Sequence, residues 1–190
     1  MFAFLMLRIS KTIKFLIFFY LFFNVFSSIS QTNEDVPLNN IVQYESPKPI
    51  SSLIFEDFLG NEVNLNNYHG KLIIINFWAA MCPPCRAEMP ELQNFYNLYQ
   101  GKVTIVGIDV GKQTGLGTTE EAIKLMETLN IDYPTGSLND PDSLKTFNVS
   151  TMPTTIFMDS NGDIFRRWTG AITFETLSVI TNLMLSYQDT

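Results

Sequence analysis

The sequence predicts an α/β domain with a central mixed β-sheet and helices on both faces. Continuous apolar runs at residues 71–79 and 103–109 have the composition of strands buried on both sides of a sheet. Residues 84–99, 122–129 and 174–187 carry apolar side chains at helical spacing. Strands that alternate with helices and then end in a hairpin are typical of a mixed sheet.

The first half of the domain begins with a predicted hairpin, in which residues 53–58 and 62–65 flank Gly60-Asn61. The buried strand that follows leads directly into a long helix. Pro90 lies inside that helix and is expected to kink it, because proline cannot donate the helical hydrogen bond.

The segment after the second buried strand is rich in glycine. Residues 111–117 do not follow the residue order of a phosphate-binding loop, so we expect a flexible loop. Thr118 and Glu121 then form a capping-box pattern, which predicts the start of the next helix.

The last part of the domain contains a short helix, a hairpin and a final amphipathic helix. Asp140-Pro141 is expected to open the short helix, which ends at Phe147. Asn161-Gly162 predicts a tight turn between strands at 154–158 and 164–168.

Composition and charge limit the classes of function. The 190 residues suit one domain with a short leader. Three of the 12 basic residues lie in the first 30, where no acidic residue occurs, so the rest of the chain carries nine basic against 19 acidic residues. Because no basic stripe remains there, nucleic-acid binding is not expected.

Residues 1–30 have the pattern of a targeting segment. Arg8, Lys11 and Lys14 precede the apolar run 15–23, and small residues follow at 27–30. This pattern indicates either a cleaved signal peptide or an N-terminal membrane anchor, and both place the domain outside the cytoplasm. We expect residues 31–50 to be a linker and residues 51–190 to form the domain.

Cys82-Pro83-Pro84-Cys85 contains the only two cysteines of the chain and stands between a strand and a helix. This setting is typical of reversible dithiol–disulfide chemistry. A purely structural disulfide has a weak rationale, because so short a loop constrains the unfolded chain little. A c-type haem site would need His where Arg86 stands, and a structural zinc site about four ligands. His69 is the only histidine and is expected in a surface loop, so we expect neither metal nor cofactor beyond the disulfide itself.

The sequence resembles the thioredoxin-like extracytoplasmic thiol-disulfide oxidoreductases, the TlpA/ResA-like group of the AhpC/TSA-redoxin superfamily, over residues 51–188. The segments that carry the resemblance are 76–79, 82–90, 152–155 and 159–162 before Gly170. It implies a thioredoxin fold with an N-terminal β-hairpin and an αβ insertion at 111–133.

Residue roles follow from the C-x-x-C motif together with this resemblance. Cys82 is expected at the helix N-terminus, where backbone dipoles favour a thiolate, and would be the nucleophile. Cys85 would be the resolving thiol. Glu88 matches an acidic residue of the family's reductants and would raise a thiol pKa and handle protons. The resemblance places Pro153 in the family's cis-proline loop, where the backbone of Met152 would bind an extended substrate.

Two positions depart from family patterns. Met81 stands where the family usually has Trp before the first cysteine, which changes the surface that a partner would touch. Asn76 stands where plain thioredoxins carry a buried Asp, so another acid or water would have to move protons. Phe77, Trp78 and Ala79 are expected to pack beneath the site, and Trp78 is also a candidate docking residue.

Pro83 and Pro84 indicate the direction of the reaction. Neither has an N–H to donate to the Cys82 sulfur, and no His lies between the cysteines, so we expect a reducing potential. The expected activity is reduction of disulfides in exported proteins, recharged by a membrane electron donor, with the protein as a monomer. The resemblance makes apocytochrome c one possible substrate class.

Three other functions remain open. A disulfide oxidase or isomerase would have a more oxidising redox potential. Pro83-Pro84 argues against such a potential, and its measurement would decide. A peroxiredoxin would share the fold, but its usual P-x-x-x-T-x-x-C pattern is absent from the sequence. A copper-handling module would use both thiolates, but a third ligand such as His is missing nearby.

Overall fold

The computed structural model describes residues 53–188 except 69, 139 and 141. The predicted leader, the whole predicted linker and His69 lie outside the described residues, so the expectations for them stay predictions. No helix within residues 53–188 is both long and apolar enough to cross a membrane.

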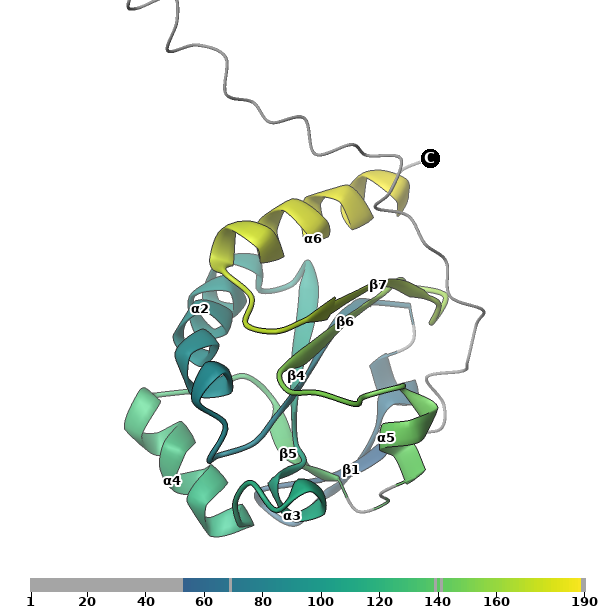
Figure 1. The fold of residues 1–190 in the computed structure, drawn as a ribbon. Coiled ribbons are helices and arrows are strands. Elements are labelled where there is room, and N and C mark those ends of the chain that lie inside the picture. Colours follow the sequence, from purple (N-terminus) through teal and green to yellow (C-terminus); the bar gives the residue numbers. More distant parts are fainter. Residues whose placement is uncertain (1–52, 69, 139, 141, 189–190) are drawn as a thin grey trace, which may run out of the picture. The chain divides into compact units, whose positions relative to one another are not determined.

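The strands and helices alternate along the chain, as Figure 1 shows. The strands are β1 (Ile54–Asp57), β2 (Glu62–Asn64), β3 (Leu72–Trp78), β4 (Val103–Asp109), β5 (Thr135–Leu138), β6 (Thr154–Met158) and β7 (Ile164–Thr169). The helices are η4, a 3-10 turn (Leu65–Tyr68), α2 (Pro83–Tyr99), α3 (Gly111–Thr114), α4 (Thr119–Leu129), α5 (Asp142–Thr146) and α6 (Phe174–Gln188).

All seven described strands form one sheet in the order β2-β1-β5-β4-β3-β6-β7. Strands β3, β4 and β5 are parallel neighbours, whereas β6, β7 and the β1–β2 hairpin join them in antiparallel pairs. The predicted mixed sheet is therefore confirmed.

Helices cover both faces of the sheet, and the central strand β3 is therefore buried on both sides. Its side chains alternate between two cores. Ile74 and Trp78 face the core that α2, α4 and α6 complete. Ile75 and Phe77 face the second core, where Phe77 lies 5.9 Å from Phe147, ring centre to ring centre. In Figure 1, α2 and α6 lie on one side of the sheet and α5 on the other.

We expected a flexible loop over all of residues 111–117, but only part of this glycine-rich segment is a loop. Residues 111–114 form the short helix α3, whose Thr114 hydroxyl donates to the carbonyl of Val110. Gly115 ends the helix with a φ of 71°, a conformation that glycine adopts without strain. Tertiary hydrogen bonds, which the local sequence does not encode, hold this segment: the Met81 N–H donates to the Leu116 carbonyl at 2.8 Å.

Strand β5 is not predicted from the sequence. It is four residues long and contains Gly136, so its β-propensity is weak. The glycine is required by packing, since a Cβ there would collide with the carbonyl oxygen of Glu56 on β1. The gap between the insertion and the short helix thus contains the strand that joins the N-terminal hairpin to the sheet.

Other local predictions agree with the structure. Thr118 and Glu121 form the predicted capping box at the start of α4. The turn between β6 and β7 is closed by the Asp159 carboxylate, which accepts the N–H groups of Asn161 and Asp163. Helix α2 continues past Pro90, which is exposed on its surface, and the kink expected there stays a prediction.

Candidate active site around the Cys82–Cys85 disulfide

The two cysteines form a disulfide at the start of α2, with their Cα atoms 5.3 Å apart. Cys82 is the N-cap residue of the helix, and its sulfur accepts the N–H of Cys85 at 3.4 Å. Pro83 and Pro84 occupy the first helical positions, where they remove two of the main-chain donors that a helix normally points at its cap. The Cys82 sulfur therefore receives less stabilisation than a typical helix N-terminus would give.

Exposure differs between the cysteines. Cys82 has 4 % of its surface exposed to solvent, whereas Cys85, one turn into the helix, is fully buried. The first cysteine is therefore the outer one of the pair and the second the inner one.

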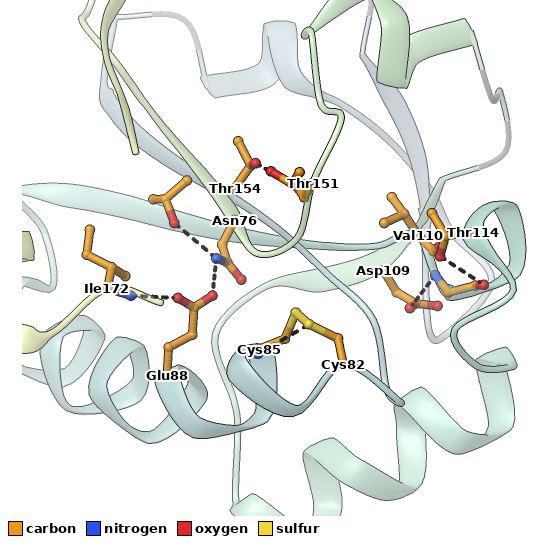
Figure 2. The surroundings of a disulfide bond; sticks show 12 residues. Asn76, Cys82, Cys85, Glu88, Asp109, Val110, Thr114, Thr151, Thr154 and Ile172 are labelled. Carbon is orange, nitrogen blue, oxygen red and sulfur yellow. Dashed lines mark hydrogen bonds between the residues drawn. A yellow bond between two sulfur atoms is a disulfide. The ribbon is translucent and has the colours of Figure 1, made fainter. Parts of the chain in front are cut away.

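A buried hydrogen-bond network lies to one side of the disulfide (Figure 2). Glu88, three residues after Cys85 and 1 % exposed, accepts the side-chain N–H of Asn76 at 2.7 Å and the backbone N–H of Ile172 at 2.9 Å. Asn76 also donates to the Thr155 hydroxyl at 3.1 Å. The network joins α2, β3, β6 and the segment before α6, so the carboxylate of Glu88 has a fixed position.

Burial controls the protonation of Glu88. It raises the pKa from 4.5 to about 7, although the hydrogen bonds from Asn76 and Ile172 oppose the rise. A carboxyl with this pKa can accept or donate a proton near neutral pH. It lies on the same side of α2 as Cys85, the position that proton handling would require.

Tyr133 lies next to this network and was not singled out from the sequence. A Cβ at Gly107, the β4 partner of Asn76, would lie only 3.0 Å from the Tyr133 ring. Burial raises the pKa of Tyr133, and the charge of Glu88 adds to the rise. Its hydroxyl and the Asn76 side-chain oxygen are buried without a hydrogen-bond partner among the described residues. A glycine inside a buried strand was the available signal for this close approach.

Asp109 is a second buried carboxyl, at the end of β4. It accepts the Gly111 N–H at 3.0 Å and the Ser137 hydroxyl at 3.4 Å. Burial raises its pKa from 3.8 to about 6, against these hydrogen bonds. Figure 2 shows it on the other side of the disulfide from Glu88. Only its position as the last residue of a buried strand marked it in the sequence.

The Met152–Pro153 peptide is cis, as predicted. Pro153 is buried, and its carbonyl accepts the Gly170 N–H at 2.9 Å. Met152 is partly exposed and contacts both cores. The segment leads into β6, which carries Thr155 of the buried network.

Met81 and Trp78 have opposite environments. Met81, directly before Cys82, is 59 % exposed and is available to a partner. Trp78 is fully buried, so its prediction as a docking residue is wrong. The alternation of β3 turns Trp78 toward the face that α2 covers, in agreement with the expectation that Trp78 packs in the core.

No group of three or more His, Cys, Asp or Glu side chains in residues 53–188 is arranged to hold a metal ion. The described site contains a disulfide, a carboxyl with a pKa near neutral and an exposed apolar side chain. This combination can transfer two electrons and the accompanying protons between dithiols and disulfides.

Comparison with known proteins supports this chemistry. A model of the AhpC/TSA family matches residues 48–167. Two thiol-disulfide oxidoreductases named ResA are each 30 % identical: the Geobacillus kaustophilus protein over 65 % of this chain and 69 % of its own length, and the Oceanobacillus iheyensis protein over 83 % and 80 %.

Solved structures share the fold. A thioredoxin family thiol:disulfide interchange protein from Chlorobium tepidum superposes with a TM-score of 0.64 and 25 % identity, over 75 % of this chain and 99 % of that one. StoA from Bacillus subtilis gives a TM-score of 0.58 and 22 % identity, over 67 % and 94 %. A secreted Mycobacterium tuberculosis disulfide oxidoreductase gives 0.62 and 20 %, over 70 % and 97 %.

The thioredoxin fold expected from the sequence is thus present, and the matched segment includes the disulfide and nearly all of the sheet around it. The chain belongs to the AhpC/TSA family and is a thiol-disulfide oxidoreductase of the ResA-like kind.

Proposed function

We propose that this protein reduces disulfides in exported proteins outside the cytoplasm, with Cys82 as the nucleophile and Cys85 as the resolving thiol. The observation that carries the proposal is the position of Cys82 as N-cap of α2 in front of a fully buried Cys85. An incoming disulfide meets Cys82 first, and Cys85 lies within bonding distance behind it.

The reaction has two exchanges. The Cys82 thiolate attacks one sulfur of the substrate disulfide, which forms a mixed disulfide and releases one substrate thiolate. The Cys85 thiolate then attacks the Cys82 sulfur, which closes the internal disulfide and releases the second substrate thiolate. Two electrons pass from the protein to the substrate, so a dithiol electron donor, in our proposal a membrane protein, must reduce Cys82 and Cys85 again.

Glu88 accepts the proton that leaves the inner thiol. Its buried carboxyl has a pKa near neutral and lies one helical turn beyond Cys85. Asn76 holds it through a hydrogen bond but cannot itself change charge. The negative charge of ionised Glu88 also raises the pKa of the neighbouring thiols by like-charge repulsion.

Poor stabilisation of the Cys82 thiolate favours reduction of substrates over their oxidation. Pro83 and Pro84 donate no N–H to the sulfur, and Glu88 adds a repelling charge nearby. We expect a potential nearer the roughly −270 mV of thioredoxin than the roughly −120 mV of a strong oxidant. Equilibration with a dithiol buffer measures it, and a value above about −180 mV would assign the protein to disulfide oxidation instead.

Substrate contacts involve the backbone of Met152 and the side chain of Met81. The partly exposed Met152 precedes the buried Pro153, and Met81 is exposed beside Cys82. The leader pattern at residues 1–30 supports export, in the periplasm or on the outer face of the membrane. Apocytochrome c is the substrate class to test first on the basis of the family resemblance.

Trapping with a Cys85→Ser variant tests the proposal. Without the resolving thiol, the variant should retain a disulfide-bonded substrate on Cys82, released by a reductant and identified by mass spectrometry. The matched control is Cys82→Ser, in which the remaining thiol is buried and should trap little. Equal trapping by both variants would show that the assignment of nucleophile and resolving thiol is wrong.

A further inference from the structure

We propose that a groove beside Cys82 binds an acidic segment of the disulfide substrate, adjacent to the substrate's reactive cysteine. The groove, called here the α4 groove, lies between the loop before Cys82 and helix α4 and has a volume of about 370 Å³. Its lining residues are Ala80, Met81, Arg86, Glu121, Lys124, Leu125 and Thr128. The inference rests on the proposed function and adds a class of preferred substrate to it.

The α4 groove is lined in part by residues close in sequence to the reactive Cys82. Met81 is the residue before Cys82, and the Arg86 N–H donates to the Cys82 carbonyl from the first turn of α2. Ala80 and Leu125 are almost completely buried and form an apolar floor, whereas Met81 is 59 % exposed at its edge. A chain segment bound to Cys82 through a disulfide can therefore extend into the groove.

Both walls of the α4 groove are held in place by the fold. The Met81 N–H donates to the Leu116 carbonyl at 2.8 Å, which fixes the loop wall. A Cβ at Gly117 would lie 3.1 Å from the Ala80 side chain, so the two loops are in close contact. The capping box of Thr118 and Glu121 fixes the start of α4. The groove is consequently formed before a substrate binds.

The charge of the α4 groove is opposite to that of the whole protein. Arg86 and Lys124 are exposed, and neither forms an ion pair with an acidic side chain within the described part of the chain. Glu121 is the one carboxylate in the lining, and it accepts the Thr118 N–H at 2.8 Å at the helix start. The full chain carries a net charge of −7. An acidic segment is therefore repelled by most of the surface and attracted at this groove.

The expected selectivity is moderate. Exposed ion pairs contribute about 0.3–0.7 kcal/mol each, so two positive side chains that act on the same segment contribute about 0.6–1.4 kcal/mol, or roughly a 3- to 10-fold preference for an acidic over a neutral segment. Screening by salt should remove most of this preference at about 1 M ionic strength, where the Debye length is about 3 Å. Apolar contact with Met81 and Leu125 does not depend on salt and would remain.

Peptide disulfides provide the direct test. Three peptides share one disulfide and differ only in the two residues beside one cysteine, which are Glu, Gln or Lys. The fully reduced protein should reduce the Glu peptide roughly 3- to 10-fold faster than the Gln peptide at low salt, and the Lys peptide slowest. The readout is the ratio of the rates for two peptides with the same protein variant, because this ratio cancels any change in the reactivity of the protein's own thiols.

A double charge reversal assigns the preference to the groove. Arg86→Glu together with Lys124→Glu should invert the order of the peptides. The matched control is Lys71→Glu together with Lys102→Glu, two exposed residues before β3 and β4 at the other end of the sheet. The control makes the same change in net charge and should keep the preference for Glu.

The outcomes separate this inference from the proposed function. Reduction of all three peptides at equal rates would overturn the inference and leave the reductase function in place. An unchanged order in the groove variant, or an equal effect of the control, would show that net charge or another surface determines the preference. Failure to reduce any of the three peptides would count against both proposals.

Discussion

Replacement of Glu88 by Gln should make the stability of the fold much less dependent on pH. Burial raises the Glu88 pKa from 4.5 to about 7, so the folded protein keeps a proton that the unfolded chain releases. The stabilisation is complete below about pH 4.5 and is lost as the pH rises through about 7. At about 1.4 kcal/mol per pH unit, the loss amounts to about 3 kcal/mol of unfolding free energy.

Gln is a close mimic of the protonated side chain. It has one oxygen to accept the Asn76 or Ile172 N–H and one donor group, as the neutral carboxyl does. Near pH 4.5 the variant and the parent should therefore differ little in stability. At pH 8 the variant should be more stable by about 2–3 kcal/mol, because it avoids an ionised group in a buried site.

Urea unfolding of the oxidised protein at a series of pH values measures this difference. Tryptophan fluorescence is a suitable signal, since Trp78 is fully buried in the folded state. Glu91→Gln makes the same chemical change one turn along α2 at a more exposed residue, and it controls for the substitution itself. If the parent and Glu88→Gln curves run parallel between pH 5 and 8, the assignment of a proton to buried Glu88 is wrong.

Three further substitutions test separate features. Asp109→Asn should remove a second pH dependence, because burial raises the Asp109 pKa from 3.8 to about 6 and stability falls as the pH rises through that range; the same urea series measures it. Gly136→Ala should lower the unfolding free energy by about 1–3 kcal/mol through collision with the Glu56 carbonyl, seen as a lower midpoint of thermal unfolding. Thr118→Ala should lower the unfolding free energy by about 1 kcal/mol, because it removes the side chain that accepts the Glu121 N–H, and urea unfolding measures this loss. An unchanged unfolding midpoint in Gly136→Ala or Thr118→Ala, or an unchanged pH dependence in Asp109→Asn, would contradict the reason given for that variant.

Elements with strong local signals could be predicted from the sequence, and elements set by distant contacts could not. The apolar runs of β3 and β4 identify buried strands whatever their neighbours are. Strand β5 has no such run, because Gly136 was required by the approach of β1 from another part of the chain. The segment of helix α3 likewise depends on a distant contact, the hydrogen bond from the Met81 N–H to the Leu116 carbonyl.

The same distinction applies to the site. Cys82, Cys85 and Pro153 belong to local motifs, and the structure has them in the expected arrangement. Thr155 and Ile172 reach the network across 79 and 84 residues of sequence, so no local pattern could mark them. Trp78 was assigned two environments, and the direction of its side chain on β3 decided between them.

The buried network also answers the question raised by Asn76. In plain thioredoxins the strand position of Asn76 carries the buried acid, and here that position carries an amide instead. The amide nitrogen lies 2.7 Å from the Glu88 carboxylate, so a buried carboxyl is still present near this position but extends from α2 rather than from β3. Because Glu88 and Cys85 share one helix, their separation depends on helix geometry and not on how the helix packs against the sheet. The acid of this site is therefore carried by the helix, and the amide on the strand holds it by a hydrogen bond.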